Sequence, residues 1–192
     1  MSHLIKLIAG LGNPGMQYEQ TRHNAGFWYI DELAKTYNVQ LKAEKKYFGE
    51  TCTAHINGHD VTLIKPTTFM NHGGQGIAAY ANFYKIPAES ILVAHDELDF
   101  PVDKIRLKVG GGHGGHNGLR DIIARLGNKQ FLRLRIGIDH PGNSNQVTGY
   151  VLGKPSADDR ISIQNTIEAA IKVTPLLVKG DQQQAMQTLH KA

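Results

Sequence analysis

Apolar residues recur along the 192-residue chain at two periods, every second position in some segments and every third or fourth in others. The shorter period, or a short apolar run, predicts strands over 4–9, 50–56, 60–65, 91–95, 104–109 and 131–138. The longer period predicts helices from an Asn24 cap to about Tyr37, over 74–84, after a glycine-rich segment at 110–118, and near 157–172 and 182–190. Because helices and strands interleave, and Asn57-Gly58 predicts a hairpin, we expect an α/β fold. It would be a single domain over 1–192, with a twisted mixed central β-sheet flanked by α-helices.

Positive charge is concentrated in the predicted strands at 104–109 and 131–138. From Lys104 to Arg135 there are eight Lys and Arg residues and one acid, a local balance of +7 against +4 for the whole chain. A solvated face would explain such charges, but the near absence of acids favours contact with phosphate. If the two strands are neighbours, Lys108 and Arg135 lie near the glycine-rich segment and could together grip a terminal phosphate.

Cysteine content and hydropathy limit where the protein works. Cys52 is the one cysteine, so no internal disulfide can form and a reducing compartment is favoured. No apolar run approaches the ~18 residues of a membrane helix, and Lys6 interrupts the N-terminal one. We therefore expect a cytoplasmic protein that does not enter a membrane.

The run GLGNPG at 10–15 matches the G-x-G-x-x-G pattern of dinucleotide-binding sites. Such a pattern should open directly into a helix, whereas here Pro14 removes one N–H donor and about eight residues precede Asn24. No predicted strand ends in an acid at the expected distance. A dinucleotide-binding oxidoreductase is therefore a disfavoured alternative.

His23 stands just before the helix predicted from Asn24, and Asp96 follows the buried run ILVA at 91–94. A lone histidine in this position could simply be a capping or surface residue. A helix N-terminus favours neutral imidazole, the form that a general base needs, whereas a nearby carboxylate favours imidazolium. Because α/β sheets build their sites at strand ends, we expect Asp96 to orient His23. The sequence has no G-x-S-x-G elbow, so water activated by His23 is the simplest nucleophile.

Three asparagines, Asn13, Asn71 and Asn117, adjoin glycine-rich turns. Asparagine and glycine suit tight turns, and this alone could account for each of them. Their amides both donate and accept, so together they could instead orient a carbonyl, a water or a ribose. The 110–118 segment could bind an anion through its backbone N–H groups or act as a mobile lid.

His95, His113 and His116 invite a metal interpretation, because His113 and His116 are three residues apart. They have no firm ligand partner in the sequence, and neither an H-E-x-x-H motif nor a cysteine cluster is present. We therefore expect neither a metal nor another cofactor.

Seven segments occur in one order along nearly the whole chain: GLGNPG (10–15), TRHNAG (21–26), PTTFMN (66–71), AHDELD (94–99), GGGHGGHNGLRDI (110–122), RLRIGI (133–138) and VLGKP (151–155). Each is modest alone, but together they are highly specific, and they resemble the bacterial peptidyl-tRNA hydrolase family. The resemblance implies a monomeric enzyme without a cofactor. It implies hydrolysis of the ester between an N-blocked peptide and the 3′-terminal ribose of tRNA, which frees tRNA for translation.

The resemblance also implies roles for individual residues. The catalytic base falls on His23, its stabilising acid on Asp96, and the residue that separates N-blocked from free aminoacyl substrates on Asn13. Contacts with the substrate and the tRNA end fall on Tyr18, Phe69, Met70, Asn71, Gly114, His116 and Asn117. The phosphate clamp falls on Lys108 and Arg135.

We hypothesise that the ester carbonyl lies between Asn13, Asn71 and the glycine-rich segment, with the peptide in a groove between 66–71 and 110–117. The alternative is a non-catalytic RNA-binding module, which would keep the basic faces but would not need the His23 and Asp96 pair. Such modules usually stack bases on exposed aromatic residues, and an aromatic content of 7% gives this little support.

Two residues, Leu132 and Asp139, depart from the family pattern, in which a polar residue is often found at the first position and glycine is common at the second. Both positions adjoin the basic strand face. We therefore expect them to affect tRNA affinity at that edge.

Overall fold

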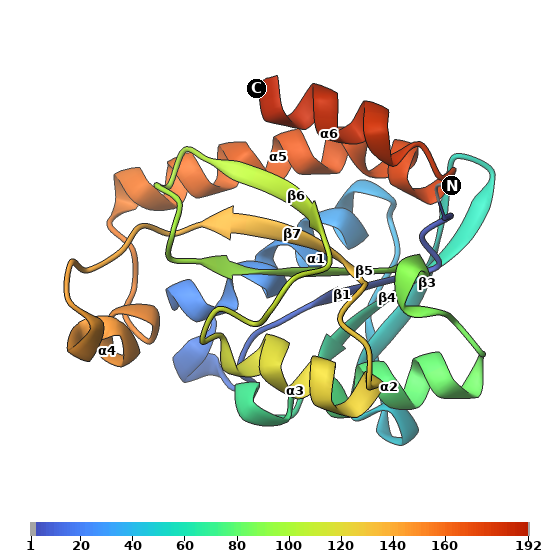
Figure 1. Ribbon diagram of the computed structural model, residues 1–192, viewed down its shortest axis with the longest axis horizontal. Coiled ribbons are helices and arrows are strands. Elements are labelled where there is room, and N and C mark those ends of the chain that lie inside the picture. The colour runs from blue at the N-terminus through green and yellow to red at the C-terminus, as the bar shows by residue number, and fades with distance from the viewer. Residues whose placement is uncertain (1–2, 192) are drawn as a thin grey trace.

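The computed structural model describes residues 3–191 and arranges seven strands in one mixed sheet (Figure 1). The strands are β1 (Leu7–Gly10), β2 (Lys42–Glu44), β3 (Gly49–Ile56), β4 (His59–Pro66), β5 (Ile91–Glu97), β6 (Ile105–Val109) and β7 (Leu132–Gly137). Their order across the sheet is β2-β3-β4-β1-β5-β7-β6. The central strands β4, β1, β5 and β7 run parallel, and antiparallel strands flank them on both sides. The predicted α/β class with a mixed sheet is confirmed.

Helices cover both faces of this sheet (Figure 1). They are α1 (Ala25–Thr36), α2 (Gly74–Phe83), α3 (Asn117–Leu126), α4 (Val147–Val151), α5 (Ala157–Val178) and α6 (Gln182–Lys191). One apolar cluster packs α1, α5 and α6 against one face, and a second packs α2 and α3 against the other. Because β1 and β5 are covered on both sides, they are buried almost throughout. Within residues 3–191, no helix is both long and apolar enough to cross a bilayer.

The predicted elements are confirmed in type and order, with differences at their ends. β5 continues to Glu97, so Asp96 lies within the end of the strand and not beyond it. α5 runs through Pro175 to Val178, well past the predicted end near residue 172. The edge strand β2 and the short helix α4 were not predicted, because three and five residues are too few to show a period.

Two glycines let α1 approach the ends of β1 and β5 closely. A Cβ atom on Gly10 would lie 2.2 Å from the carbonyl oxygen of Gly26, and one on Gly26 would lie 2.4 Å from that of Ala94. A larger residue at either position would push the helix away from the sheet. The short 3-10 helix η2 (Arg22–Asn24), which leads into α1, is therefore held beside the end of β5.

Candidate active site

The parallel strands end at one edge of the sheet, and a cavity of about 900 Å³ lies beside these ends. The cavity is lined by most of the residues predicted for the site: Asn13, His23, Phe69, Met70, Asn71, Asp96, Lys108, Gly114, His116, Asn117 and Arg135. Tyr18 is not among the lining residues, but its ring lies 6.1 Å from that of Phe69 in an edge-to-face arrangement. Open α/β sheets bind their ligands at such strand ends. This cavity is therefore the candidate active site.

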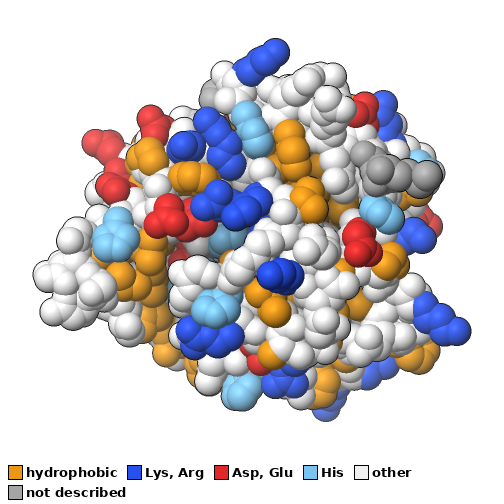
Figure 2. Space-filling view, viewed as in Figure 1, with side chains coloured by type: hydrophobic (Ala, Val, Ile, Leu, Met, Phe, Trp, Pro, Cys, Tyr) orange, Lys and Arg blue, Asp and Glu red, His pale blue; other side chains and the backbone are white. Residues whose placement is uncertain are grey.

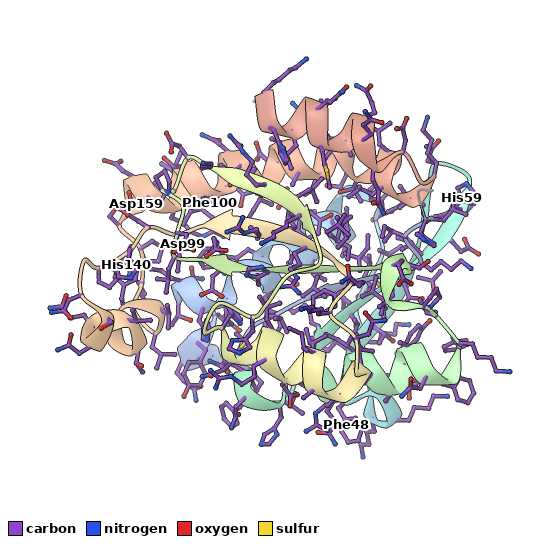
Figure 3. All side chains as sticks on the ribbon, in the orientation of Figure 1. Phe48, His59, Asp99, Phe100, His140 and Asp159 are labelled. Carbon is purple, nitrogen blue, oxygen red and sulfur yellow. The ribbon has the colours of Figure 1, made fainter. Side chains whose placement is uncertain are left out.

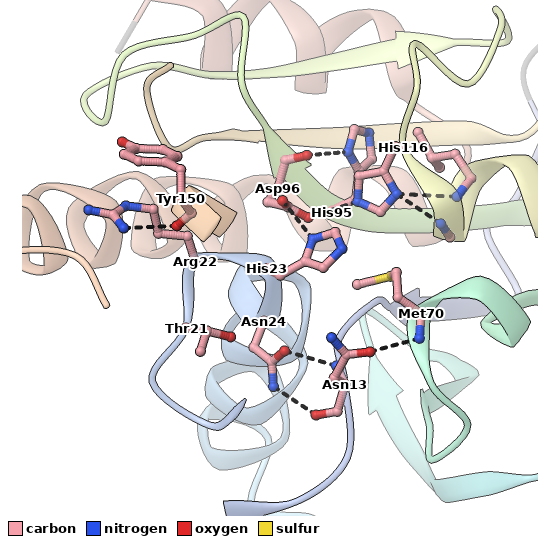
Figure 4. A network of polar contacts seen from close by, with 12 residues as sticks. Asn13, Thr21, Arg22, His23, Asn24, Met70, His95, Asp96, His116 and Tyr150 are labelled. Atoms are coloured by element: carbon pink, nitrogen blue, oxygen red, sulfur yellow. Dashed lines mark hydrogen bonds and ion pairs between the residues drawn. The ribbon is translucent and has the colours of Figure 1, made fainter. Parts of the chain in front are cut away.

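His23 and Asp96 form a hydrogen-bonded pair in the cavity (Figure 4). Nδ1 of His23 lies 2.9 Å from Oδ2 of Asp96. Because an ionised carboxylate can only accept, Nδ1 carries the hydrogen and Nε2 of His23 keeps its lone pair. Within residues 3–191 this Nε2 has no hydrogen-bond partner, and the ring borders the cavity. The pair has the arrangement that a general base and its orienting acid require.

Burial and Asp96 act in opposite directions on the pKa of His23. Burial lowers this pKa, but the charge of Asp96 and the hydrogen bond to it raise it by more, so it lies above the ordinary value of 6.5. The sequence left open whether the helix N-terminus or Asp96 has the larger effect on this pKa, and did not consider burial. Burial would also raise the pKa of Asp96, yet the imidazoles of His23 and His116 hold it well below its usual range. Asp96 is therefore an anion throughout the physiological range.

The imidazole of His116 also contacts Asp96. Its Nε2 lies 2.7 Å from Oδ1 of the carboxylate. Its Nδ1 accepts the backbone N–H groups of Gly118 and Leu119, at 3.1 and 3.3 Å, and so caps α3. Both ring nitrogens are occupied, so His116 can hold Asp96 but offers no lone pair to a substrate proton. Sequence reasoning missed this contact, since no motif links the two positions.

The hydrogen bonds argue against a metal site at these residues. Ligand atoms of His23, Asp96 and His116 lie within 4.8 Å of one another, close enough to surround an ion. A histidine binds a metal through a nitrogen without hydrogen, whereas Nδ1 of His23 and Nε2 of His116 carry the hydrogens donated to Asp96. His95 and His113 bond to backbone groups through Nδ1. The donor set therefore suits a hydrogen-bonded triad better than a cation.

Asn13 is fixed at the cavity through both its backbone and its side chain (Figure 4). Its backbone N–H and C=O pair with the side-chain amide of Asn24, at 2.8 and 3.0 Å. Its Oδ1 accepts the N–H of Met70 at 2.7 Å, which leaves the Nδ2 amine as the group available to a ligand. Asn24 occupies the N-cap position of α1, as predicted, but its side chain makes no capping hydrogen bond to the helix. The side-chain amide of Asn24 is instead bound to the backbone of Asn13, a contact that the sequence does not predict.

The glycine-rich run at 10–15 lacks the structure of a dinucleotide site. After β1 the chain turns into the 3-10 helix η1 (Met16–Tyr18), and α1 begins only at Ala25. A pyrophosphate at this run would therefore not meet a helix N-terminus directly after the strand. The oxidoreductase alternative is not supported.

The basic residues of β6 and β7 serve two purposes. The strands pair antiparallel, and both Lys108 and Arg135 line the cavity, as predicted. Lys and Arg side chains also gather over β6, β7 and α3 on this face of the molecule (Figure 2). Arg133, however, is only 3% exposed and donates to the carbonyls of Gly111 and Gly112 in the glycine-rich segment. The expectation of a basic face turned wholly toward phosphate is corrected at this residue, which anchors a loop.

One wall of the cavity contains no residue that the sequence assigned to the site, although VLGKP (151–155) reaches it. It is formed in and after α4 by Val147, Thr148, Val151 and Leu152. Arg22 attaches this wall to the turn that carries His23. Its guanidinium donates to the carbonyl oxygen of Tyr150 at 2.9 Å and lies 3.9 Å from the centre of that ring. The largely apolar wall therefore has a fixed place relative to the general-base candidate.

The two departures from the family pattern lie in different surroundings. Leu132 is 1% exposed and packs in the core, so it does not reach the basic face as expected. Asp139 is exposed, and its Oδ1 accepts the N–H of His140 at 2.8 Å. Its φ of 70° is a conformation that glycine adopts without strain, which accounts for the glycine common at this position.

Comparison with known proteins agrees with this geometry. The sequence model of the family described as peptidyl-tRNA hydrolase matches residues 7–192. The peptidyl-tRNA hydrolase of Neisseria meningitidis serogroup C (strain 053442) is 54% identical over 190 residues, 99% of each chain. That of Alteromonas mediterranea is 56% identical over 187 residues, 97% of this chain and 96% of the relative. The crystal structure of the Acinetobacter baumannii peptidyl-tRNA hydrolase superimposes with a TM-score of 0.95 at 49% identity, covering 99% of this chain and 97% of that one.

Proposed function

Because the chain belongs to the peptidyl-tRNA hydrolase family, we propose that it hydrolyses the ester between an N-blocked peptide and the 3′-terminal ribose of tRNA. The observation that carries the proposal is the His23 and Asp96 pair, with Nε2 of His23 unoccupied at the cavity. The products are a free peptide and a tRNA that can be charged again.

The reaction begins with a water molecule hydrogen-bonded to Nε2 of His23. His23 takes a proton from this water as its oxygen bonds to the ester carbonyl carbon, and the charge of Asp96 stabilises the imidazolium that forms. The tetrahedral intermediate then collapses with cleavage of the bond to the ribose oxygen. That oxygen receives the proton back from His23, which restores the neutral base.

Asn13 stabilises the negative charge of the tetrahedral intermediate. Its Oδ1 is occupied by the N–H of Met70, so the group it presents to the substrate is an N–H donor. A donor fixed before the reaction stabilises a developing oxyanion without reorganising. The same donor can contact the carbonyl of an N-blocked substrate, consistent with a role in substrate selection.

The remaining cavity residues bind the two ends of the substrate. Phe69, Met70, Asn71, Gly114 and Asn117 contact the terminal nucleotide and the peptide, with Tyr18 beside Phe69. Lys108 and Arg135 bind a phosphate of the tRNA by point charge and planar fork respectively. His116 acts on the substrate only through Asp96.

The test is release of the N-acetyl-aminoacyl group from tRNA, compared with release from unblocked aminoacyl-tRNA. We expect rapid hydrolysis of the blocked substrate alone, and a loss of about 10²–10⁴-fold in kcat for His23→Ala. A His23→Ala variant with full turnover would remove the base from the mechanism. Tight, salt-sensitive tRNA binding without hydrolysis would instead favour the binding-module alternative.

The reaction takes place in the cytoplasm, where peptidyl-tRNA arises during translation, and the enzyme acts as a monomer. The cavity supports the second point, since a single chain supplies the base, the orienting acid and the basic residues. Light scattering at working concentration should give one chain mass. A stable dimer would contradict the monomer.

A further inference from the structure

Arg133 and Arg135 lie on the same face of β7, but their guanidinium groups are used differently. Both terminal nitrogens of Arg133 donate to backbone carbonyls of the glycine-rich segment, and one also donates to Lys129 at 3.1 Å. In the described part of the chain, Arg135 is hydrogen-bonded only through Nε, which donates to Oε1 of Glu97 at 2.8 Å. Within residues 3–191, the two terminal nitrogens of Arg135 have no hydrogen-bond partner.

Two further contacts restrict the Arg135 side chain. Its guanidinium carbon lies 4.3 Å from the centre of the Phe100 ring, within the range of a cation–π interaction. The Glu97 carboxylate is itself held, because its second oxygen accepts the N–H of Asp99 at 3.2 Å. Glu97 also belongs to β5, where its backbone stands opposite Gly137 of β7. The partner of Arg135 is therefore fixed by the strand that carries Asp96.

We propose that Glu97 and Phe100 are positioning residues for Arg135, which fix its guanidinium so that both terminal nitrogens face a phosphate of the bound tRNA. The inference rests on the proposed phosphate contact of Arg135 and deepens it. A free arginine loses rotamer freedom when it binds, and an arginine that is already held loses less. An acid beside a phosphate site is otherwise unfavourable, since it repels the ligand.

Loss of the Glu97 charge and loss of the ordering of Arg135 change KM in opposite directions. The direction of the change in KM therefore tests the proposal. Glu97→Ala removes one negative charge from the cavity, which by itself should lower KM for N-acetyl-aminoacyl-tRNA. If Glu97 orders Arg135, the same substitution should instead raise KM by about two- to tenfold, with kcat unchanged. Glu97→Gln keeps an acceptor for Nε but also removes the charge, so its KM should not rise and should lie at or below the wild-type KM. An unchanged or lower KM for Glu97→Ala would overturn the proposal.

Asp99 offers a matched charge control. It is exposed, lines the same cavity and lies beside Phe100 (Figure 3), but its side chain makes no hydrogen bond or ion pair with Arg135 within the described residues. Asp99→Asn removes the same charge and should lower KM. Phe100→Leu removes the ring and keeps the charge, and should raise KM in the same direction as Glu97→Ala.

A double-mutant cycle separates positioning from a structural role. In an Arg135→Ala background, Glu97→Ala should not raise KM further, because the side chain that it orders is gone. A rise of the same size in both backgrounds would overturn the proposal. Arg135→Ala alone tests the premise: if it leaves KM unchanged, the proposed phosphate contact fails. If Arg135→Ala raises KM and Glu97→Ala does not, only the positioning role fails.

Discussion

Asp96 binds two imidazoles, and only one of them can take a proton from a substrate. His23 and His116 lie 2.9 and 2.7 Å from the two carboxylate oxygens, and their ring centres are 5.1 Å apart. The second nitrogen of His116 is occupied by the first turn of α3, whereas that of His23 borders the cavity. Both residues are histidines, and both are paired with the same acid. Their roles differ because of the second ring nitrogen, the one that does not face Asp96.

The arginines of β7 show the same contrast. Arg133 has both terminal nitrogens bound to the glycine-rich segment, while Arg135 is held through Nε alone. In each pair one member stabilises the structure of the site, and the other keeps a free end for the ligand. Substitutions at Asp96, at the two histidines and at the two arginines can break this division between supporting and reacting side chains.

The largest expected effect is that of Asp96→Asn. An amide at this position can accept from one imidazole but presents N–H to the other, which can force His23 into the tautomer with hydrogen on Nε2. We expect kcat to fall by about 10²–10⁴-fold, with the Kd for tRNA within a factor of about two. Single-turnover hydrolysis and filter binding would measure the two quantities. Equal losses in both would point to a structural role for Asp96.

The second prediction concerns pH. His23 must be neutral to act as a base, so kcat/KM should fall about tenfold per unit of pH below its pKa. Because Asp96 raises this pKa, the midpoint of the acidic limb should lie above 6.5. Burial lowers the pKa of His95 to about 4, too low to produce this limb. A midpoint below 6.5 would contradict the assignment to His23.

The third prediction concerns His116→Asn. Asparagine is as good a helix cap as any residue, so α3 keeps its cap while Asp96 loses one hydrogen bond. We expect kcat to fall about tenfold, a loss close to the lower end of the range for one hydrogen bond to a charged group. His116→Ala, which also removes the cap, should in addition lower stability by about 1 kcal/mol. A loss of activity as large as that of His23→Ala would contradict the different roles assigned to His23 and His116.

The smallest expected effect separates the two arginines. Arg135→Gln should reduce the slope of log Kd against log salt for tRNA by about one, the effect of one lost phosphate contact. Arg133→Gln should leave this slope nearly unchanged and lower the melting temperature, because it leaves carbonyls of the glycine-rich segment without their donor. Reversed results would show that Arg133 is the phosphate ligand.

Much of the molecule followed from sequence alone. Alternating apolar residues and the Asn57-Gly58 turn predicted the β3 and β4 hairpin, whose turn residues have φ values of 51° and 79°. Long or strongly periodic segments gave the type and order of the remaining major elements. The motifs around His23 and Asp96 predicted a pair that is 73 residues apart in sequence and in hydrogen-bond contact in space. These predictions succeeded because periodicity, turn chemistry and strand-end placement are local or nearly local properties.

Only the tertiary structure decided what each polar side chain does. Asn24 occupies the predicted N-cap position, but its side chain holds the loop of Asn13. Arg133 belongs to a basic strand face that was expected to contact phosphate, but it anchors a loop. His116 reads as a loop residue but shares Asp96 with His23. A side chain's chemistry is set by which of its donors and acceptors are already occupied. Those partners come from distant segments of the chain, so local sequence patterns carry no record of them.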